Sequence, residues 1–570
     1  MHVGLRLVDL LVDAGIRTAF GVPGGQTSPL YHGMAVRRDA IRHVLMRDER
    51  SAVFAADAYA RTTGRAGACD ATVGPGATNL VSGLVEARSS SIPLLAIVAD
   101  IPRSWEHRRH LGSASQGFAQ REFLAPCVKW FGHVSVPEAV DDVVSHALRV
   151  ATSNRPGPVV VEIPDDVFSS EMADGPRPPV DARYPRLRSA PEPAVVRDAA
   201  QTIARSRKVL VLFGGGAAIS GAGAEGRALV ERLGVPFATT ISGKGVIEET
   251  HPLCAGISGS FGVPLANDLL DEADCVIVVG AKLGQAATLG WEVPRPGATV
   301  VHLDVDAEEI GRNTPSLGMH GDAALGLRAL LEALPESGHE SDWDLALIAR
   351  RSADWWENQP SYARARDGDA VKPQDVVREL GKHLGPADMV VTDASLSSGW
   401  AGTRWRTEHA GRRILAPRGV AGLGWGLPAA VGAAFGLADT GSPGRVVCLA
   451  GDGGWGYSLT EVETLARFGV PVVSVVLNNS VLGWNKHVVQ RRYGDEHVSQ
   501  DFSQVNYAGA AACLGAHGRR VERIEDLAEA LDVAMAVRDR PSVVEVVSSE
   551  FETPVIKPMS GGSGSPRSAY

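Results

Sequence analysis

Short apolar runs alternate with amphipathic stretches along most of this chain. Residues 446–450 and 470–477 are rich in β-branched residues, and the apolar residues of 458–468, between them, recur at helical spacing. Two strands joined in this way by a helix pair in parallel through a right-handed crossover. The same alternation recurs in the N-terminal and central parts of the chain, so we predict an α/β protein built on parallel sheets.

Two stretches rich in proline and charge, at 174–193 and 334–373, interrupt the alternation. A chain of 570 residues is also too long for a single core. We therefore predict three doubly wound parallel-sheet α/β domains, at 1–173, 190–335 and 370–556. In the central one the pattern predicts strands at 208–213, 275–279 and 299–305 and a helix around 225–233. The last residues, 557–570, are rich in glycine and serine and are predicted to form a flexible tail.

The composition is that of a large soluble protein, with 44% hydrophobic and 21% charged residues. A net charge of −10 without a long basic run argues against nucleic acid as a partner. No apolar run approaches the ~20 residues of a membrane span, and the N-terminus does not resemble a signal peptide. Six scattered cysteines without a CxxC pair indicate free thiols rather than a metal site. We expect a cytoplasmic protein that binds neither membrane nor nucleic acid.

The candidate chemistry centres on the sequence Gly451-Asp452-Gly453-Gly454, which follows the run at 446–450, and on Asn478-Asn479, which follows the run at 470–477. The carboxyl ends of consecutive parallel strands lie side by side, so Asp452 and Asn479 are expected to face one another. Carboxylate and amide oxygens suit Mg²⁺, and the glycines let a diphosphate approach the backbone. Alone, Asp-Gly is more typical of a hairpin turn, but the flanking strand–helix–strand pattern disfavours that alternative.

This GDG…NN pattern resembles the cofactor-binding motif of thiamine-diphosphate-dependent enzymes, and most of the chain resembles their acetolactate synthase-like branch. The resemblance implies thiamine diphosphate and Mg²⁺ as cofactors. It also implies a pyrimidine-binding N-terminal domain, a Rossmann-like central domain and a diphosphate-binding C-terminal domain. The residues implied at the diphosphate are Gly451, Asp452, Gly453, Gly454 and Asn479, and the implied metal ligands are Asp452, Asn479 and the backbone carbonyl of Val481.

Glu49 stands between a predicted strand at 41–46 and a predicted helix at 50–62. A carboxylate there is often no more than a partner for the helix dipole. Its context, however, resembles the glutamate helix of the same family. The resemblance implies that Glu49 hydrogen-bonds the aminopyrimidine of the cofactor and so promotes deprotonation of the thiazolium C2. Family members usually build this site between two subunits, so we expect a homodimer or homotetramer.

Four further N-terminal residues enter through the same resemblance. Gly76 and Asn79 belong to a GPGATN segment that looks like the family's pyrimidine-side loop, although a plain strand-to-helix connection is the alternative. Gly24 lies in a PGG loop that resembles the one beside the reactive carbon. Gln116 falls near the position of an active-site glutamine, although its neighbours differ from the family pattern. The alternative for Gln116 is a surface residue.

In the C-terminal third, Leu423 occupies the place where relatives carry a bulky apolar residue under the cofactor. Without the resemblance it reads as an ordinary core residue. Three serines that follow the predicted strand at 389–392, namely Ser395, Ser397 and Ser398, are candidate hydrogen-bond donors to the diphosphate. The alternative is that they form a loop or a helix cap.

Two departures from the family pattern concern substrate and cofactor. The arginine-bearing segment that binds the carboxylate of the second keto acid in true acetolactate synthases is replaced here by residues 280–286, which contain no arginine. This puts an acetolactate product in doubt. It also weakens the case for FAD, as does the glycine run at 214–216, which does not complete GxGxxG because Ile219 stands at the third glycine position. A structural central domain is favoured, with FAD binding as the second alternative.

We therefore predict a decarboxylating carboligase, a transferase that forms an enamine from a 2-keto acid and adds it to an acceptor carbonyl. Three alternatives stay open: a lyase that releases an aldehyde, a flavin or nicotinamide oxidoreductase, and a non-catalytic partner paralogue. The presence of both Glu49 and the Asp452/Asn479 pair argues against the paralogue, because an inactive chain has no physical need of both. The sequence identifies neither the donor nor the acceptor.

Overall fold

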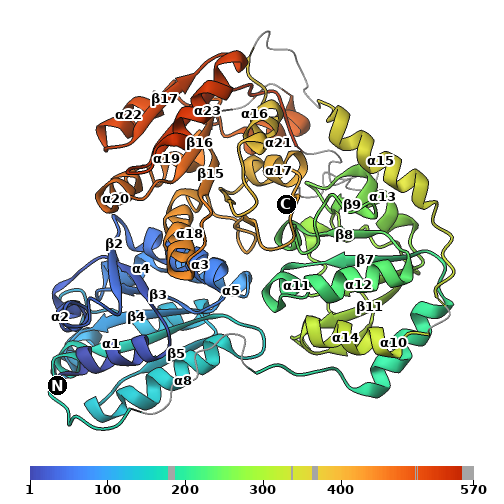
Figure 1. Ribbon diagram of the computed structural model, residues 1–570. Helices are drawn as coiled ribbons and strands as arrows, with labels where there is room; N and C mark the ends of the chain where they lie inside the picture. Colours follow the sequence, from blue (N-terminus) through green and yellow to red (C-terminus); the bar gives the residue numbers. More distant parts are fainter. Residues whose placement is uncertain (178–186, 336–337, 362–369, 495, 497, 555–570) are drawn as a thin grey trace.

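The structure is a computed structural model that describes residues 1–177, 187–335, 338–361, 370–494, 496 and 498–554. These residues form three six-stranded sheets, and every strand pair within the sheets is parallel. Figure 1 shows three lobes, with the N-terminal domain in blue, the central domain in green to yellow and the C-terminal domain in orange to red. The prediction of three doubly wound α/β domains is therefore confirmed.

The N-terminal sheet has the strand order β2-β1-β3-β4-β6-β5. Its strands are β1 (Thr18–Gly21), β2 (Arg42–Leu45), β3 (Gly67–Ala71), β4 (Leu94–Asp100), β5 (Trp130–His133) and β6 (Pro158–Pro164). Its helices are α1 (Val3–Asp13), α2 (Ser28–Val36), α3 (Glu49–Thr63), α4 (Pro75–Asn79), α5 (Val81–Ser89), α6 (Glu106–His110), α7 (Gln120–Leu124), α8 (Val140–Thr152) and α9 (Asp165–Phe168). All seven residues of β4 are buried, as expected for a central strand covered by helices on both faces.

The central sheet has the order β12-β11-β10-β7-β8-β9, the doubly wound order of a Rossmann fold. Its strands are β7 (Val209–Phe213), β8 (Phe237–Thr239), β9 (Cys254–Ile257), β10 (Cys275–Val279), β11 (Thr299–Asp304) and β12 (Leu317–His320). Its helices are α10 (Pro193–Arg205), α11 (Gly215–Ser220), α12 (Gly223–Leu233), α13 (Pro264–Glu272) and α14 (Ala323–Ala333), and α15 (Leu345–Asn358) follows them. The predicted strands and helix of this domain are present.

The C-terminal sheet, β14-β13-β15-β16-β18-β17, repeats the relative strand order of the N-terminal sheet. Its strands are β13 (Met389–Thr392), β14 (Ile414–Leu415), β15 (Val446–Gly451), β16 (Val473–Asn478), β17 (His517–Val521) and β18 (Ser542–Val547). Its helices are α16 (Pro373–Lys382), α17 (Leu396–Arg404), α18 (Gly426–Thr440), α19 (Asp452–Gly456), α20 (Glu461–Phe468), α21 (Gly483–Tyr493), α22 (Tyr507–Cys513) and α23 (Leu527–Ala536). The helix predicted at 458–468 begins later, at Glu461, because the separate short helix α19 precedes it.

Helices α3 and α18 hold the N-terminal and C-terminal domains together, and Figure 1 shows them side by side. Their contact surface consists of small residues, which lets the two backbones approach closely. A Cβ atom on Gly432 of α18 would overlap the carbonyl oxygen of Ala55 in α3. The pairing of these helices therefore depends on glycine at position 432.

A buried ion cluster lies beside this contact. Arg61 of α3 donates to both carboxylate oxygens of Asp57, at 2.7 and 2.8 Å, and also contacts Glu86 of α5 at 3.4 Å. Glu86 in turn accepts the backbone N–H groups of the loop before α18, at Gly419, Val420 and Ala421. Burial raises the pKa of Asp57. At Glu86 burial acts in the same direction, but Arg61 and the N–H of Gly419 outweigh it and lower the pKa.

Other sequence expectations can be compared with the described residues. All six cysteines are free; Cys69, Cys254, Cys275 and Cys448 are buried, Cys127 is partly buried and Cys513 is exposed. No described helix combines the length and apolar character that crossing a bilayer requires. The predicted tail, at 557–570, lies outside the described residues.

The ion cluster leads to a stability prediction. Replacing Arg61 by Met should lower the free energy of unfolding by about 3–5 kcal/mol, because two buried carboxylates lose their cation. As a control, Arg378→Met removes an arginine that pairs with Asp375 on the surface of α16, and should cost less than about 1 kcal/mol. Chemical denaturation followed by tryptophan fluorescence measures both. Equal effects of the two substitutions would contradict a structural role for the cluster.

Candidate functional site

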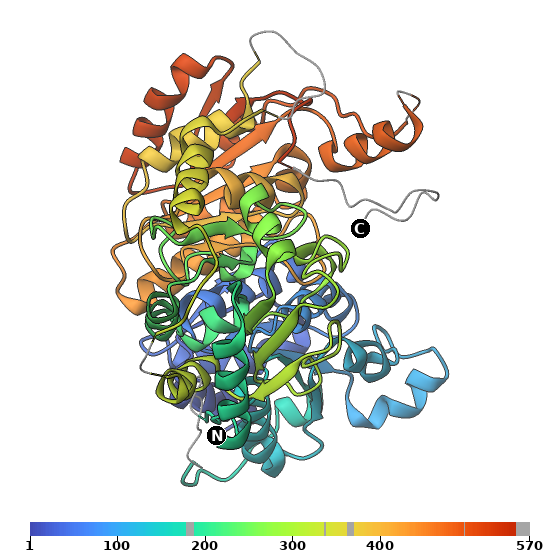
Figure 2. The same cartoon turned by 90° about the vertical axis from the view of Figure 1, so that its right-hand side faces the viewer.

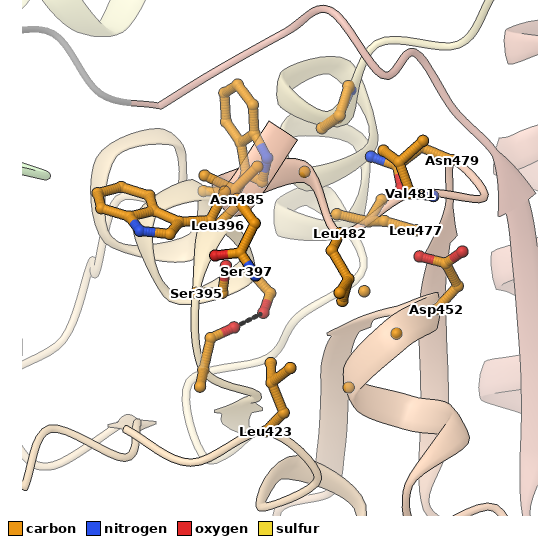
Figure 3. Close-up of a pocket in the computed structure, with 18 of the residues that line it drawn as sticks. Ser395, Leu396, Ser397, Leu423, Asp452, Leu477, Asn479, Val481, Leu482 and Asn485 are labelled. Carbon is orange, nitrogen blue, oxygen red and sulfur yellow. Dashed lines mark hydrogen bonds between the residues drawn. The ribbon is translucent and has the colours of Figure 1, made fainter. Parts of the chain in front are cut away.

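Asp452 and Asn479 lie at the adjacent carboxyl ends of two paired strands. Gly451, the last residue of β15, pairs with Leu477 of β16, so the residues that follow each strand emerge side by side. Both side chains line a cavity of about 390 Å³ (Figure 3). The third residue predicted to bind the metal, Val481, lines the same cavity. The structure thus brings the three predicted ligands together.

The Asp452 carboxylate is buried and lacks a counter-ion. Its side chain is only 2% exposed, and no described Lys, Arg or His lies within ion-pair distance of it. Burial raises the pKa of Asp452 to about 6, although the backbone N–H groups of Gly453 and Ser480 act in the opposite direction. A buried carboxylate of this kind is stabilised by a cation. Across the described residues there is no cluster of three or more His, Cys, Asp or Glu, so a zinc-type ligand set is not an alternative there.

The glycines of the motif have different surroundings. A Cβ atom on Gly451 would meet nothing within 4 Å, so its backbone faces open space in the cavity wall. A Cβ atom on Gly454 would lie 2.7 Å from the carboxylate of Asp393, and one on Gly453 would lie 3.0 Å from Leu482. Gly451 therefore leaves room for a ligand, whereas Gly453 and Gly454 permit close packing around the site.

Asp393 is a buried carboxylate next to the cavity wall, and sequence reasoning missed it. It follows β13, is buried, and accepts the N–H groups of Ala394, Gly424 and Gly426 at 2.7, 3.1 and 2.8 Å. Burial raises the pKa of Asp393 to about 6. These bonds fix the loop that carries Leu423, whose side chain lines the cavity (Figure 3). The available signal was the acidic residue directly after a strand end.

The three predicted serines differ in their placement. Ser395 and Ser397 line the cavity, whereas Ser398 does not. The Ser397 hydroxyl donates to the carbonyl oxygens of Asp393 and Ala394, at 3.1 and 2.9 Å, and the Ser398 hydroxyl donates to Ser395 at 3.1 Å. Ser397 and Ser398 therefore also act as helix-start residues, the alternative that the sequence left open. Their role toward a diphosphate stays a prediction.

The central domain and α21 close the cavity on another side. Phe261, which follows β9, and Trp484 of α21 both line the cavity, and their rings meet edge to face with centroids 5.5 Å apart. Arg418, in the loop before α18, also lines it. Phe261 and Arg418 were not predicted from the sequence, because contacts between domains leave no local pattern.

The predicted N-terminal residues form a second cluster. Glu49 is the first residue of α3, and its Oε2 accepts a hydrogen bond of 2.9 Å from Nδ2 of Asn79. A Cβ atom on Gly76 would lie 3.2 Å from Oε1 of Glu49. Gln116 is exposed and has a φ of 62°, and it packs on Gly74 of the GPGATN segment.

Gly24 also belongs to this part of the fold, since a Cβ atom there would overlap the side chain of Thr72, at the start of the same loop region. None of the five predicted N-terminal residues, Glu49, Gly24, Gly76, Asn79 and Gln116, is among the described residues that line the cavity around Asp452. Within one chain, the two clusters of predicted residues are therefore separate.

A second cavity, of about 600 Å³, opens onto the glycine run of the central domain. Gly215 and Gly216 line it, and a Cβ atom on Gly216 would lie 2.8 Å from Gly280, so the turn after β7 packs closely on the end of β10. Arg155 lines it too and pairs with Asp306 and Glu309, at 3.0 and 2.6 Å. The two cavities adjoin at shared lining residues, which are Phe261, Ala286, Arg418 and Ala421.

Comparison with known families accounts for all three domains. Residues 1–123 match the N-terminal TPP binding domain of thiamine pyrophosphate enzymes, residues 196–330 match their central domain, and residues 393–546 match their C-terminal TPP binding domain. The chain belongs to the thiamine pyrophosphate enzyme family. Glu49, Gly76 and Asp452 thus lie in the two domains whose family descriptions name the cofactor.

Relatives place this thiamine-diphosphate enzyme in the acetolactate synthase-like branch. It is 32% identical to the acetolactate synthase large subunit of Parasynechococcus marenigrum (strain WH8102), over 95% of this chain and 86% of the relative. It is 31% identical to the acetolactate synthase isozyme 2 large subunit of Escherichia coli (strain K12), over 98% of both chains. A probable acetolactate synthase large subunit of Methanococcus aeolicus is 30% identical, over 94% of this chain and 90% of the relative.

These relationships confirm the predicted family and branch. The protein is a thiamine-diphosphate-dependent transferase of the carboligase type. The lyase and partner-paralogue alternatives are not favoured.

Proposed function

We propose that this carboligase uses a 2-keto acid as donor and a second small carbonyl compound as acceptor, at a site that two copies of the chain form together. The observation that carries the proposal is the pair of half-sites. Asp452 and Asn479 lie in one domain, whereas the Glu49–Asn79 pair lies in another and outside the same cavity. A homodimer, alone or within a tetramer, is the smallest assembly that joins the two halves.

The diphosphate half of the site fits a divalent cation. Asp452 supplies a buried carboxylate that has no counter-ion among the described residues. Asn479 supplies an amide oxygen, and the backbone carbonyl of Val481 completes the proposed protein ligands of Mg²⁺. The Asn479 Oδ1 also accepts the N–H of Val481 at 3.2 Å, which fixes the turn after β16. Gly451 leaves the backbone open to a diphosphate. Ser395 is the serine donor we place nearest to it.

The pyrimidine half fits an ionisable heterocycle. Glu49 is half-buried and is held by Asn79, while Gly76 leaves space beside its carboxylate. We place Glu49 as the residue that hydrogen-bonds the aminopyrimidine, with Gly24 and Gln116 at the mouth of the pocket. Thiamine diphosphate, when bound, supplies the electron sink that lets a 2-keto acid lose carbon dioxide and a new carbon–carbon bond form. Leu423 would support its rings from the cavity wall.

The placement of the loops agrees with a two-chain site. In Figure 2 the light-blue segment that contains α6 and the orange-red segment that contains α21 extend toward the same side of the molecule. Gln116 follows α6, and Trp484 of α21 lines the Asp452 cavity. Both half-sites are therefore bordered by segments on that side, where a partner chain can reach them.

The central domain has two candidate roles. Its cavity has room for a dinucleotide, and Arg155 and Lys282 place positive charge in the wall. FAD thus stays the second candidate, after a purely structural role, and the absorption spectrum of the purified protein distinguishes the two. We further propose that the enzyme works in the cytoplasm, consistent with its free thiols.

Replacing Glu49 by Gln tests the proposed proton-transfer role. The amide keeps the shape of the side chain but is a poor hydrogen-bond partner for the cofactor's ring nitrogen, so turnover should fall by about 10²–10⁴-fold. Thiamine diphosphate affinity should change little. The matched control is Asp48→Asn, one residue earlier, which keeps a good helix cap and should retain activity. Near-normal turnover of Glu49→Gln would show that the assigned role is wrong.

Mixing two inactive chains tests the two-chain site. A heterodimer of Glu49→Gln and Asp452→Asn chains contains one site with both residues intact, if each site takes Glu49 from one chain and Asp452 from the other. Random assembly should then restore ~25% of the normal activity. A site within one chain predicts no recovery. Thiamine-diphosphate-dependent release of carbon dioxide from a panel of 2-keto acids is the measurement.

The pKa of Asp452 predicts how metal binding depends on pH. The carboxyl must lose its proton to bind a cation, so Mn²⁺ affinity in the absence of cofactor should fall about tenfold per pH unit below pH 6. Electron paramagnetic resonance measures free Mn²⁺ directly. Asp452→Asn should bind weakly at every pH, whereas Glu552→Gln, in the same cavity wall, should keep the normal pH dependence. An unchanged pH dependence in Asp452→Asn would exclude Asp452 as the ligand.

A further inference from the structure

Arg418 lies in the wall that separates the Asp452 cavity from the cavity of the central domain. It belongs to the loop between β14 and α18, five residues before Leu423, and it lines both cavities. Among the described residues that line the Asp452 cavity, Arg418 is the only one with a positively charged side chain. Its position in this cavity therefore matters for any anionic substrate.

No anion of the protein is assigned to this guanidinium. Within the described part of the chain, Arg418 has neither an ion pair nor a hydrogen bond from its side chain. Burial lowers its pKa, and Glu86 is the acidic group that acts in the opposite direction. The Glu86 carboxylate, however, is already bonded to Arg61 and to the backbone of the loop that follows Arg418. Arg418 thus has room for a carboxylate from outside the protein.

The other cations near this wall are already engaged. Arg155 pairs with Asp306 and Glu309, Arg188 lies 3.6 Å from Asp322, and Lys282 donates to the carbonyl oxygen of Ser89. Lys282 is the only basic residue of the segment 280–286, which follows β10. Its ammonium group is therefore turned to the protein backbone.

An aromatic wall adjoins the Arg418 guanidinium. The guanidinium carbon lies 5.6 Å from the centre of the Phe261 ring, and Phe261 in turn contacts Trp484. Stacking on an aromatic ring orients a guanidinium while leaving its N–H groups available. A cation beside two aromatic side chains suits a small acid that carries an apolar group next to its carboxylate.

We propose that Arg418 binds the carboxylate of the acceptor, so that the acceptor is a 2-keto acid rather than an aldehyde. The inference rests on the proposed function. The donor is the less suitable partner, because its carboxylate must leave as carbon dioxide. Strong binding of that carboxylate would stabilise the ground state more than the transition state. The carboxylate of an acceptor persists in the product. Arg418 is thus a specificity-determining residue for the acceptor.

The test compares two acceptors for one donor. Holoenzyme with thiamine diphosphate and Mg²⁺ receives pyruvate together with acetaldehyde, and mass spectrometry gives the ratio of the hydroxy keto acid to the hydroxy ketone. Arg418→Gln should shift this ratio toward the hydroxy ketone by about 10–100-fold, the value of a charge-assisted hydrogen bond. Arg418→Lys should lie in between, because it keeps the charge but loses the planar fork. Thiamine diphosphate affinity, measured by calorimetry, should stay within about twofold in both variants.

Each other outcome has a definite meaning. An unchanged product ratio in Arg418→Gln overturns the inference while leaving the proposed function intact. An equal loss of both products, or weaker thiamine diphosphate binding, assigns Arg418 to the fold or to the cofactor and also overturns it. The control Arg155→Gln alters the central cavity alone, and the same shift in that variant would assign the anion to that cavity. No carbon dioxide release by the unsubstituted enzyme, from pyruvate or any other 2-keto acid, overturns the proposed function and this inference with it.

Discussion

The buried carboxylate of Glu86 is the interaction on which the geometry of the site depends. It belongs to the N-terminal domain, yet it binds the backbone of Gly419, Val420 and Ala421 in the C-terminal domain. Three consecutive N–H groups bonded to one buried carboxylate fix the path of the loop. In the same loop, Arg418 directly precedes these three residues and Leu423 follows them. The two cavity residues are therefore positioned by a residue of another domain.

The close contact of α3 and α18 reinforces this arrangement. With Gly432 packed on Ala55, neither helix can slide without opening a gap, because interiors are packed at nearly crystalline density. The N-terminal and C-terminal sheets repeat one strand order, and each presents its ligand-binding loops at the carboxyl ends of its strands. Glu49 is the first residue of α3, which follows strand β2 of the N-terminal sheet. Asp452 is the first residue of α19, which follows strand β15 of the C-terminal sheet. Helix packing therefore fixes Glu49 and Asp452 relative to one another within each chain.

The sequence predicts those features of the fold and the site that depend on local patterns of residues. Buried strands such as β4 and β16 are mostly apolar runs. Asp452 and Asn479 directly follow two strands of this kind, so their proximity can be inferred without a structure. The family resemblance adds Glu49, whose surroundings alone indicate only a helix start. The site roles of Gln116 and Ser398 stay predictions. Gln116 is exposed, and the Ser398 hydroxyl donates to the backbone carbonyl of Ser395.

Residues whose setting depends on contacts between domains cannot be inferred from local sequence patterns. Arg418 lies in a loop without periodicity, and only the packing of Phe261 against it, from a domain more than a hundred residues away in sequence, reveals its setting. Asp393 likewise stands after a strand end, as many structural acids do, and its bonds to Gly424 and Gly426 depend on tertiary contacts. A sequence pattern indicates which residues are buried and how they are spaced. The balance of charges in a cavity depends instead on which domains meet there.

The charged residues give the Asp452 cavity a negative part and a positive part. Among the described residues, Asp452 is a buried anion without a paired cation and Arg418 is a cation without a paired anion, although both line the same cavity. Opposite charges in a low-dielectric cavity attract strongly. The fold keeps the Asp452 carboxylate and the Arg418 guanidinium apart, because each is held by its own neighbours. Asp452 is held at a strand end by backbone N–H groups, and Arg418 lies against the Phe261 ring beside the loop bound by Glu86. Two uncompensated charges reduce the stability of the empty protein, and that cost is common where a site is prepared for charged ligands. A metal-bound diphosphate at one end and a carboxylate at the other, the two ligands that we propose, would relieve it together.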